Sequence, residues 1–225
     1  MFQSVIDLFF PKICYACLKP LRDNETTICV TCRHNLPVTN FHFKQDETVK
    51  KVLYGRAELE NATALFRFEK KGLVQELLHG LKYRGYETIG ITLGNWLGSE
   101  LKTLEAYKAI DMVIPVPLHK KKLRQRGYNQ VAEFGRHIAL QLKVPYRDDL
   151  LLKITNTKSQ VNKKRFSRWG DTDTLFALQN TSELQNKHIL LVDDIITTGA
   201  TLEACANVLK KAENIKISIA TIAIA

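Results

Sequence analysis

The sequence predicts an α/β fold built on a doubly wound, mostly parallel sheet, because apolar strand-like runs alternate with helix-like segments. The run HILLV (188–192) has no polar alternation, so we expect both of its faces to be covered, as in a parallel sheet. Segment 72–82 repeats apolar residues at helical spacing. The chain has 225 residues, 45% of them hydrophobic, which fits one domain with an appendage or two small domains.

The expected elements follow one another from the N-terminus to the C-terminus. A short amphipathic helix over residues 1–10 ends at Pro11, and residues 12–40 lack a periodic apolar pattern. We therefore divide the chain into an N-terminal module, 1–40, and a main domain, 41–225. In the main domain we expect strands at 62–68, 112–117, 188–192 and 216–225, and helices at 72–82, 89–104, 130–142 and 200–212.

The N-terminus carries no secretion signal that the sequence reveals. MFQSVIDLFF has neither the basic region nor the small-residue cleavage site of a signal peptide, which predicts a cytoplasmic protein. Disulfides are rare in that compartment. No stretch approaches the ~18 uninterrupted apolar residues that a membrane span needs.

Four of the five cysteines form two CxxC pairs, Cys14 with Cys17 and Cys29 with Cys32. Two such pairs around a short loop are typical of a zinc-ribbon-like module, in which four thiolates occupy the tetrahedral corners around Zn2+. Because all four positions are filled, we expect a structural ion. The alternative is a set of buried or redox-active thiols. The fifth cysteine, Cys205, fits a helix as a small core residue.

The positive charge is concentrated in one part of the chain. Residues 119–168 hold 14 of the 33 basic residues and only three of the 23 acidic ones. Such a concentration favours a phosphate-rich partner, either nucleic acid or a polyphosphate ligand. The densest part directly follows the strand at 112–117 and contains Lys120, Lys121, Lys122, Arg124 and Arg126.

ILLVDDIITTGATL (189–202) is the most informative segment. A buried strand runs into Asp193 and Asp194, and a loop rich in hydroxyl groups then opens a helix. Ligands of open α/β sheets bind at this end of the strands, and the free N–H groups of a helix start can hold a phosphate. The two carboxylates suit ribose hydroxyls with Mg2+ nearby. A plain threonine-capped turn would explain the hydroxyls but not the adjacent acids.

This segment resembles the ribose-phosphate loop of type I phosphoribosyltransferases at every position but one, where Ala200 replaces Gly or Thr. The resemblance implies phosphoribosyl pyrophosphate (PRPP), or a related ribose phosphate, as ligand. It places the ribose at Asp193 and Asp194 and the pyrophosphate at the turn that follows the strand at 112–117. The implied phosphate-binding residues are Thr197, Thr198, Gly199, Ala200 and Thr201 in the loop, and Leu118, His119 and Lys120 in the turn.

Together, the paired CxxC motifs, PVPLH…RGYNQ, TKSQ…R…F (157–176) and VDDIITTGATL resemble, in this order, the competence protein F (ComF) family of naturally transformable bacteria. Asp171 departs from the Asn usual after the Arg of the third run. The basic segment 155–170 corresponds to the flexible loop that closes over PRPP in the enzymes. This implies catalytic roles for the acid pair and for cations that stabilise the departing pyrophosphate, namely Lys164, Arg165 and Arg168.

The resemblance and the charge favour a PRPP-binding accessory protein of DNA uptake that also binds single-stranded DNA. Its expected DNA contacts are the five cations of 120–126 and Trp169, whose ring could stack on a base. The first alternative is an active phosphoribosyltransferase, which needs a hood over the acceptor base. The sequence ends one strand after the ribose-phosphate loop, so we expect no hood there. The second alternative is a structural adaptor for a competence helicase or recombination factor.

Overall fold

The computed structural model describes residues 11–154 and 175–225, and its centre is a four-stranded sheet in the order β1-β6-β5-β2. All three neighbouring pairs are parallel, as the sequence predicts. The strands are β1 (Ala62–Arg67), β2 (Met112–Pro115), β5 (His188–Ile196) and β6 (Lys216–Ile224). The two longest strands, β5 and β6, lie at the centre of the sheet, and all but one of the residues in each are buried.

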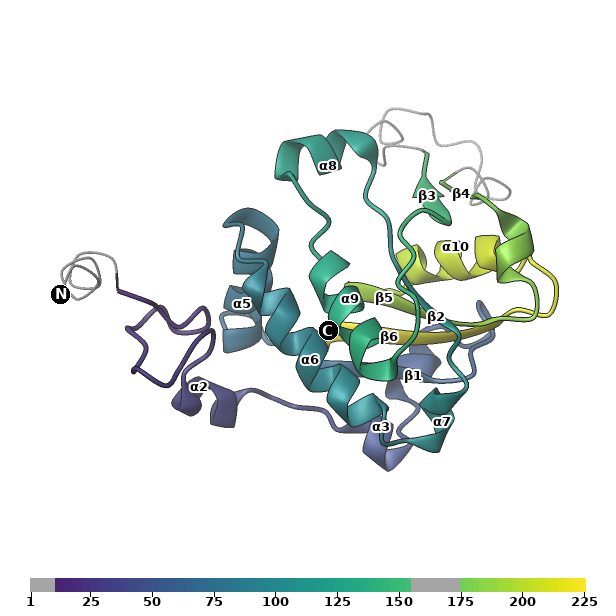
Figure 1. The fold of residues 1–225 in the computed structure, drawn as a ribbon. Coiled ribbons are helices and arrows are strands. Elements are labelled where there is room, and N and C mark those ends of the chain that lie inside the picture. The colour runs from purple at the N-terminus through teal and green to yellow at the C-terminus, as the bar shows by residue number, and fades with distance from the viewer. Residues whose placement is uncertain (1–10, 155–174) are drawn as a thin grey trace.

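Helices cover both faces of this sheet (Figure 1). On one face lie α5 (Leu73–Tyr83), α6 (Thr88–Leu101) and α9 (Ala132–Leu142), whose buried side chains share a core with Leu190 and Val192 of β5. On the other face, α10 (Ala200–Leu209) and α4 (Thr48–Val52) share a core with Ile189 and Leu191. Successive β5 residues therefore enter opposite cores, which explains why the sequence shows no polar alternation.

Three glycines let α6 and α9 approach closely. A Cβ atom at Gly94 would lie 2.5 Å from the Phe134 carbonyl oxygen, and one at Gly98 would lie 2.9 Å from the Ile138 Cα. Gly90 meets the same helix in the same way. Glycine weakens an isolated helix, but here the close contact between two helices requires it.

The structure extends one predicted strand and adds several short elements. The strand predicted at 188–192 continues to Ile196, so Asp193 and Asp194 lie within β5 and not after it. Pairing with β6 sustains this extension, because Asp193 lies opposite Thr221 and Ile196 opposite Ile224. The short elements not predicted are α2 (Val30–Asn35), α3 (Phe41–Lys44), α4, α7 (Glu105–Lys108), α8 (Lys120–Arg126), the 3-10 helix η3 (Thr181–Leu184) and an antiparallel pair, β3 (Leu151–Lys153) with β4 (Phe176–Leu178).

The N-terminal segment packs against α6 and the turn before it. The Tyr15 ring stacks on Tyr86 with centroids 4.2 Å apart, and the Arg33 guanidinium lies 4.9 Å from the centroid of a Trp96 ring. Cys14 and Cys32 are buried in the same apolar cluster as α5 and α6. The boundary at residue 40 stays a prediction, and the helix predicted over 1–10 lies outside the described residues.

The helices over residues 11–154 and 175–225 include none that is long and apolar enough to cross a membrane.

Candidate functional site

The four N-terminal cysteines converge on one point. Their Sγ atoms all lie within 4.8 Å of one another, and those of Cys17 and Cys29 are 3.9 Å apart. Tetrahedral Zn2+ with Zn–S bonds of about 2.3 Å places its sulfurs ~3.8 Å apart, so the cluster could hold zinc. Burial opposes ionisation of Cys14, but the N–H groups of Cys29, Cys17 and Ala16 outweigh it and lower the pKa of this thiol to about 7.

The acid pair lies near the carboxyl end of β5, and its two members face opposite sides of the sheet. Asp194 points to the α5 side, where its Oδ2 lies 3.0 Å from the Lys82 Nζ and accepts a 2.8 Å hydrogen bond from the Gln130 Nε2. Asp193 accepts a 2.8 Å hydrogen bond from the Asp194 N–H. Both carboxylates are buried, at 9% and 5% exposure. The site therefore holds two acids that water reaches poorly.

Burial and the neighbouring charge of Asp194 raise the pKa of Asp193 to about 8, although the positive charges of Lys82 and Lys153 oppose this shift. Near neutral pH the ligand-free Asp193 is therefore largely protonated. A protonated acid beside a second carboxyl group can both donate and accept hydrogen bonds. Such a pair matches ribose hydroxyls, which also donate and accept.

The hydroxyl-rich loop links β5 to α10. Thr197, Thr198 and Thr201 are exposed, whereas Gly199 is buried and adopts φ +76°, which favours glycine. A Cβ atom at Gly199 would lie 2.7 Å from the Leu53 Cδ2. A side chain at this position would therefore push the Leu53 side chain aside as well as strain the loop.

Arg56 anchors this loop from a distant part of the chain. Its Nη2 donates a 2.7 Å hydrogen bond to the Thr198 carbonyl oxygen, and its Nη1 pairs with the Glu203 Oε2 at 2.9 Å. Arg56 and Thr198 are 142 positions apart in the sequence, and Arg56 belongs to no recognisable motif. The contact arises because α4 packs beside the loop in the folded protein, so the sequence alone does not predict it.

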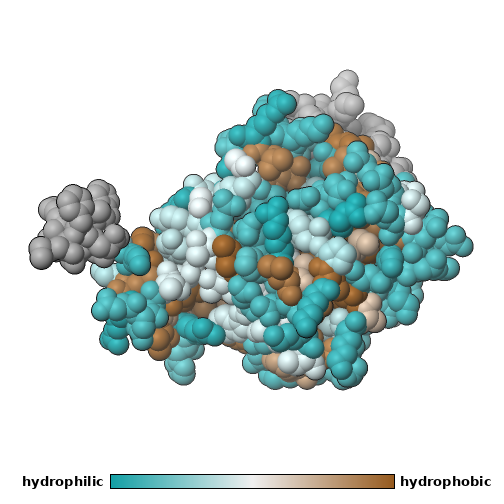
Figure 2. Space-filling view, viewed as in Figure 1, coloured by the Kyte–Doolittle hydropathy of each residue, from teal (hydrophilic) through white to brown (hydrophobic). Residues whose placement is uncertain are grey.

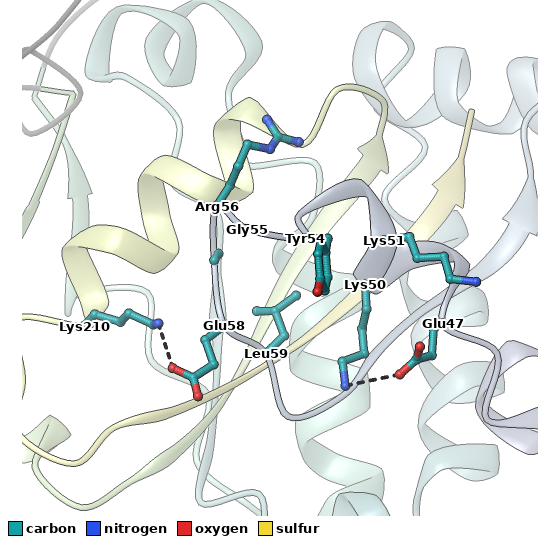
Figure 3. A pocket seen from close by; sticks show the side chains of 10 residues that line it. Glu47, Lys50, Lys51, Tyr54, Gly55, Arg56, Glu58, Leu59 and Lys210 are labelled. Atoms are coloured by element: carbon teal, nitrogen blue, oxygen red, sulfur yellow. Dashed lines mark hydrogen bonds and ion pairs between the residues drawn. The ribbon is translucent and has the colours of Figure 1, made fainter.

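Arg56 also lines a cavity of about 620 Å³ between the α4–β1 segment and the end of α10 (Figure 3). Lys50 lies 3.9 Å from Glu47, and Lys210 lies 3.2 Å from Glu58, so its charged walls are partly paired. The cavity is not lined by the acid pair. It adjoins the loop only through Arg56, and we therefore place the candidate site at the carboxyl edge of the sheet and not in this cavity.

The turn that follows β2 is held beside the acid pair. The Val116 N–H donates a 2.8 Å hydrogen bond to the Val192 carbonyl oxygen, directly before Asp193. Leu118 and His119 are half-buried in the turn, and the His119 Nδ1 accepts a 3.2 Å hydrogen bond from the second residue of α8. The turn therefore fixes where α8 begins relative to the acids.

Helix α8 carries the basic run and has no buried residue. Figure 1 shows it standing away from the sheet, and the space-filling view shows a hydrophilic surface there (Figure 2). Lys120, Lys121, Lys122 and Arg124 are exposed and have no ion-pair partner among the residues that the structure describes. Arg126 is half-buried; its guanidinium donates to the Gln130 side chain. The structure thus places the basic run on an exposed helix, for which the sequence analysis made no prediction.

The residues that follow α8 connect this helix to the site. The Tyr128 hydroxyl donates to the Leu81 carbonyl oxygen, and the Asn129 side chain donates to the Val116 carbonyl oxygen at 3.1 Å. Gln130 reaches the acid pair itself. The RGYNQ run of the sequence therefore fixes α5, the end of β2 and β5 relative to one another.

Residues 132–224 match the sequence model of the phosphoribosyl transferase domain. Competence protein F of Haemophilus influenzae is 28% identical over 113 residues, which span 50% of this chain and 49% of that protein. Competence protein ComFC of Bacillus subtilis is 25% identical over 198 residues, covering 88% and 78%. DNA utilization protein YhgH of Escherichia coli (strain K12) is 22% identical over 217 residues, covering 90% and 92%. The chain is thus similar to competence and DNA utilization proteins over most of its length.

These similarities agree with the resemblance that the ordered motifs indicate, and the parallel sheet confirms the expected fold class. The functional roles assigned to individual residues stay predictions. The structure places Asp193, Asp194, the 197–201 loop, the turn at 118–120 and α8 at one edge of the sheet. Four of the predicted residues, Lys164, Arg165, Arg168 and Trp169, lie outside the described residues.

The structure adds residues that sequence reasoning missed. Lys82 and Gln130 contact Asp194, and Arg56 holds the loop. Lys153 on β3 is half-buried near Asp193, and burial lowers the pKa of its ammonium group. Gln130 could have been selected from the sequence, because it is the last residue of the RGYNQ run. Lys82, Arg56 and Lys153 could not, because their local sequences are like those of any amphipathic helix, strand or polar loop.

Proposed function

We propose that this protein, which is similar to competence proteins, is an accessory of DNA uptake, and that it binds PRPP at the carboxyl edge of its sheet and single-stranded DNA on α8. The observation that carries the proposal is the position of a buried acid pair and a hydroxyl-rich loop beside an exposed helix with five cations. A ribose phosphate suits the first group, and a phosphate backbone suits the second.

Each part of PRPP has chemically matched residues at this edge. Asp193 and Asp194 offer hydrogen-bond partners to the ribose hydroxyls, and the exposed threonines with the start of α10 suit the 5′-phosphate. The turn at 118–120 supplies a pyrophosphate site. Mg2+, held with the acid pair and the pyrophosphate oxygens, would neutralise part of the charge. Lys82 must then share Asp194 with the ligand.

The exposure and the charge of α8 support the proposed binding of single-stranded DNA. Its lysines are not used to fold the described part of the chain, so their charges are available to phosphates. Binding through phosphates releases counterions and depends steeply on salt, with little preference for sequence. Lys120 belongs both to the pyrophosphate turn and to α8. PRPP and DNA should therefore weaken each other's binding reciprocally.

We further propose that Zn2+ bound to Cys14, Cys17, Cys29 and Cys32 is structural. All four positions of a tetrahedral ion would be filled by thiolates, which leaves no position for a substrate. The ion would hold together a segment that packs on α6 through Tyr15 and Arg33.

The names of the relatives support a role in DNA handling. They describe competence and DNA utilization in those proteins. An active phosphoribosyltransferase of nucleotide metabolism and an adaptor for a competence helicase or recombination factor are the two alternatives, and ligand binding distinguishes them.

Titration calorimetry of one protein sample with PRPP, with and without Mg2+, and with oligothymidylate tests the proposal. We expect both ligands to bind and to compete. With roughly 4–6 phosphate contacts, log K should fall with log salt at a slope of about −3 to −4, and replacing Lys120, Lys121 and Lys122 by Ala should flatten the slope by about 2. PRPP binding and turnover without DNA binding would favour the enzyme, and binding of neither ligand would favour the adaptor.

Thr201→Val sharpens the PRPP arm because it replaces a hydroxyl group by a methyl group of similar size. Thr88→Val is the matched control, since Thr88 is likewise an exposed threonine in the first turn of a helix, α6. Thr201→Val should weaken PRPP, and Thr88→Val should not. Equal affinities would mean that the phosphate binds elsewhere.

A further inference from the structure

An exposed aromatic ring lies beside the acid-pair site. Tyr83, the last residue of α5, is 69% exposed and directly follows Lys82, the ion-pair partner of Asp194. The Arg126 guanidinium lies 5.6 Å from the centroid of the Tyr83 ring, and the His79 ring is 5.0 Å away, one helical turn earlier. The ring is therefore supported by its neighbours but remains open to solvent.

Folding does not account for this position of the ring. A tyrosine that is 69% exposed buries little apolar surface, so it contributes little to the core. An open aromatic face among cations is the arrangement on which bases of single-stranded nucleic acids stack. Here the cations are those of α8, which ends at Arg126.

The ring is also connected to the acid pair by a closed set of contacts. Arg126 donates to the Gln130 side chain, and Gln130 donates to Asp194 at 2.8 Å. Asp194 pairs with Lys82, the chain neighbour of Tyr83, and Arg126 completes the set by lying over the Tyr83 ring. These contacts link the Tyr83 ring to Asp194 through Arg126 and Gln130.

We propose that Tyr83, supported by Arg126, is a base-stacking platform that holds one nucleobase of a single strand beside the acid-pair site. The strand's phosphates would follow the cations of α8, and its base would lie on the Tyr83 ring. The proposal rests on the proposed binding of single-stranded DNA. It adds a base contact, separate from the phosphate contacts, and explains why an aromatic side chain stands at this edge.

Fluorescence anisotropy with two labelled probes tests it, namely oligothymidylate and an abasic strand with the same number of phosphates. Tyr83→Ala should weaken oligothymidylate about tenfold or more, as expected for loss of one stacked base, with an unchanged salt slope. Tyr83→Phe keeps the ring and should bind like the wild type. Tyr54→Ala is the matched control, because Tyr54 is 87% exposed but lines the cavity behind the loop.

The abasic strand separates stacking from electrostatics. It should bind the wild type and Tyr83→Ala equally, because it offers no base to the ring. If Tyr83→Ala leaves the affinity for oligothymidylate unchanged, or weakens both strands alike, the platform is absent. If the wild type binds neither strand even at low salt, the proposed DNA binding itself fails, which is a different result.

Discussion

The four-cysteine cluster and the acid-pair site are assembled in opposite ways. The cysteines all come from one short segment, and their sulfurs face one another within 4.8 Å. Asp194, in contrast, contacts Lys82 of α5 and Gln130, which lies 64 positions before it in the chain. The first site is closed on itself, and the second is open at the edge of a sheet. A closed local site suits a structural ion, whereas an open site assembled from several elements suits an exchangeable ligand.

Cys17→Ser should have the largest effect, because it breaks the closed site. Zinc contributes about 10–16 kcal/mol of apparent binding free energy in small zinc modules, so the variant should lose most of its metal. Because Cys14 and Cys32 share a core with α6, hydrogen exchange should rise in α6 as well as in the N-terminal segment. Metal analysis and hydrogen exchange measure these effects.

Cys205→Ala is the control for this experiment. It removes a buried thiol from α10 and should leave the zinc content near one ion per chain. A wild type purified without chelator that contains no zinc and four free N-terminal thiols would contradict the closed-site interpretation.

Asp194→Asn should have the next largest effect, because it breaks the open site. It leaves Lys82, whose side chain is 23% exposed, without its carboxylate. Losing one partner of a buried pair costs about 3–5 kcal/mol, and the partial exposure of Lys82 reduces the expected loss to about 2–4 kcal/mol in denaturant unfolding.

The double variant Asp194→Asn/Lys82→Met sharpens this result. It should recover much of the stability, because no unpaired ammonium group remains, but it should not recover PRPP binding. If the double variant also binds PRPP normally, Asp194 does not contact the ligand.

The acid pair should also give the free energy of unfolding a distinctive pH dependence. Asp193 has its pKa raised to about 8 by burial and by the charge of Asp194. The protonated acid stabilises the fold fully below its unfolded pKa of about 4, and this contribution is lost as pH rises toward 8. Asp193→Asn mimics the protonated form. Without ligands, it should unfold less readily than the wild type at about pH 8, and the difference should shrink toward about pH 5.

Asp149→Asn provides a control of opposite sign. The Arg147 side chain lowers the pKa of Asp149, so this acid stabilises the fold above its unfolded pKa and the effect is lost as pH falls. Its neutral variant should therefore be slightly less stable than the wild type at neutral pH. Parallel pH curves for Asp193→Asn and the wild type would contradict the raised pKa.

Arg56→Ala should have the smallest effect, because it loosens the open site without touching its acids. Loss of the hydrogen bond to Thr198 costs about 1 kcal/mol, so PRPP affinity should fall about fivefold in calorimetry. Lys51→Ala, in the neighbouring helix α4, is the control and should bind PRPP normally. Equal affinities for the two variants would mean that the loop keeps its shape without the anchor.

The sequence by itself determines the parts of this protein that depend on neighbouring residues. The unbroken apolar run of β5 predicts a strand covered on both faces, and the paired CxxC motifs predict a four-sulfur cluster. The acids followed by the hydroxyl loop predict a ligand site where a strand meets a helix. In each case the residues that carry the pattern are close in the chain, so their spacing already limits the geometry.

The tertiary structure alone decides what surrounds those motifs. Helix α8 could not be predicted from apolar periodicity, because its residues are polar apart from Leu123 and none is buried. Parallel strands leave their carboxyl ends at one edge, and the helices packed on both faces bring Lys82, Gln130 and Arg56 to that edge from distant segments. The sequence around each of these residues predicts only the helix or loop that contains it, and not its partner. The contacts with Asp194 and with the loop exist because the sheet and its two helical layers pack together.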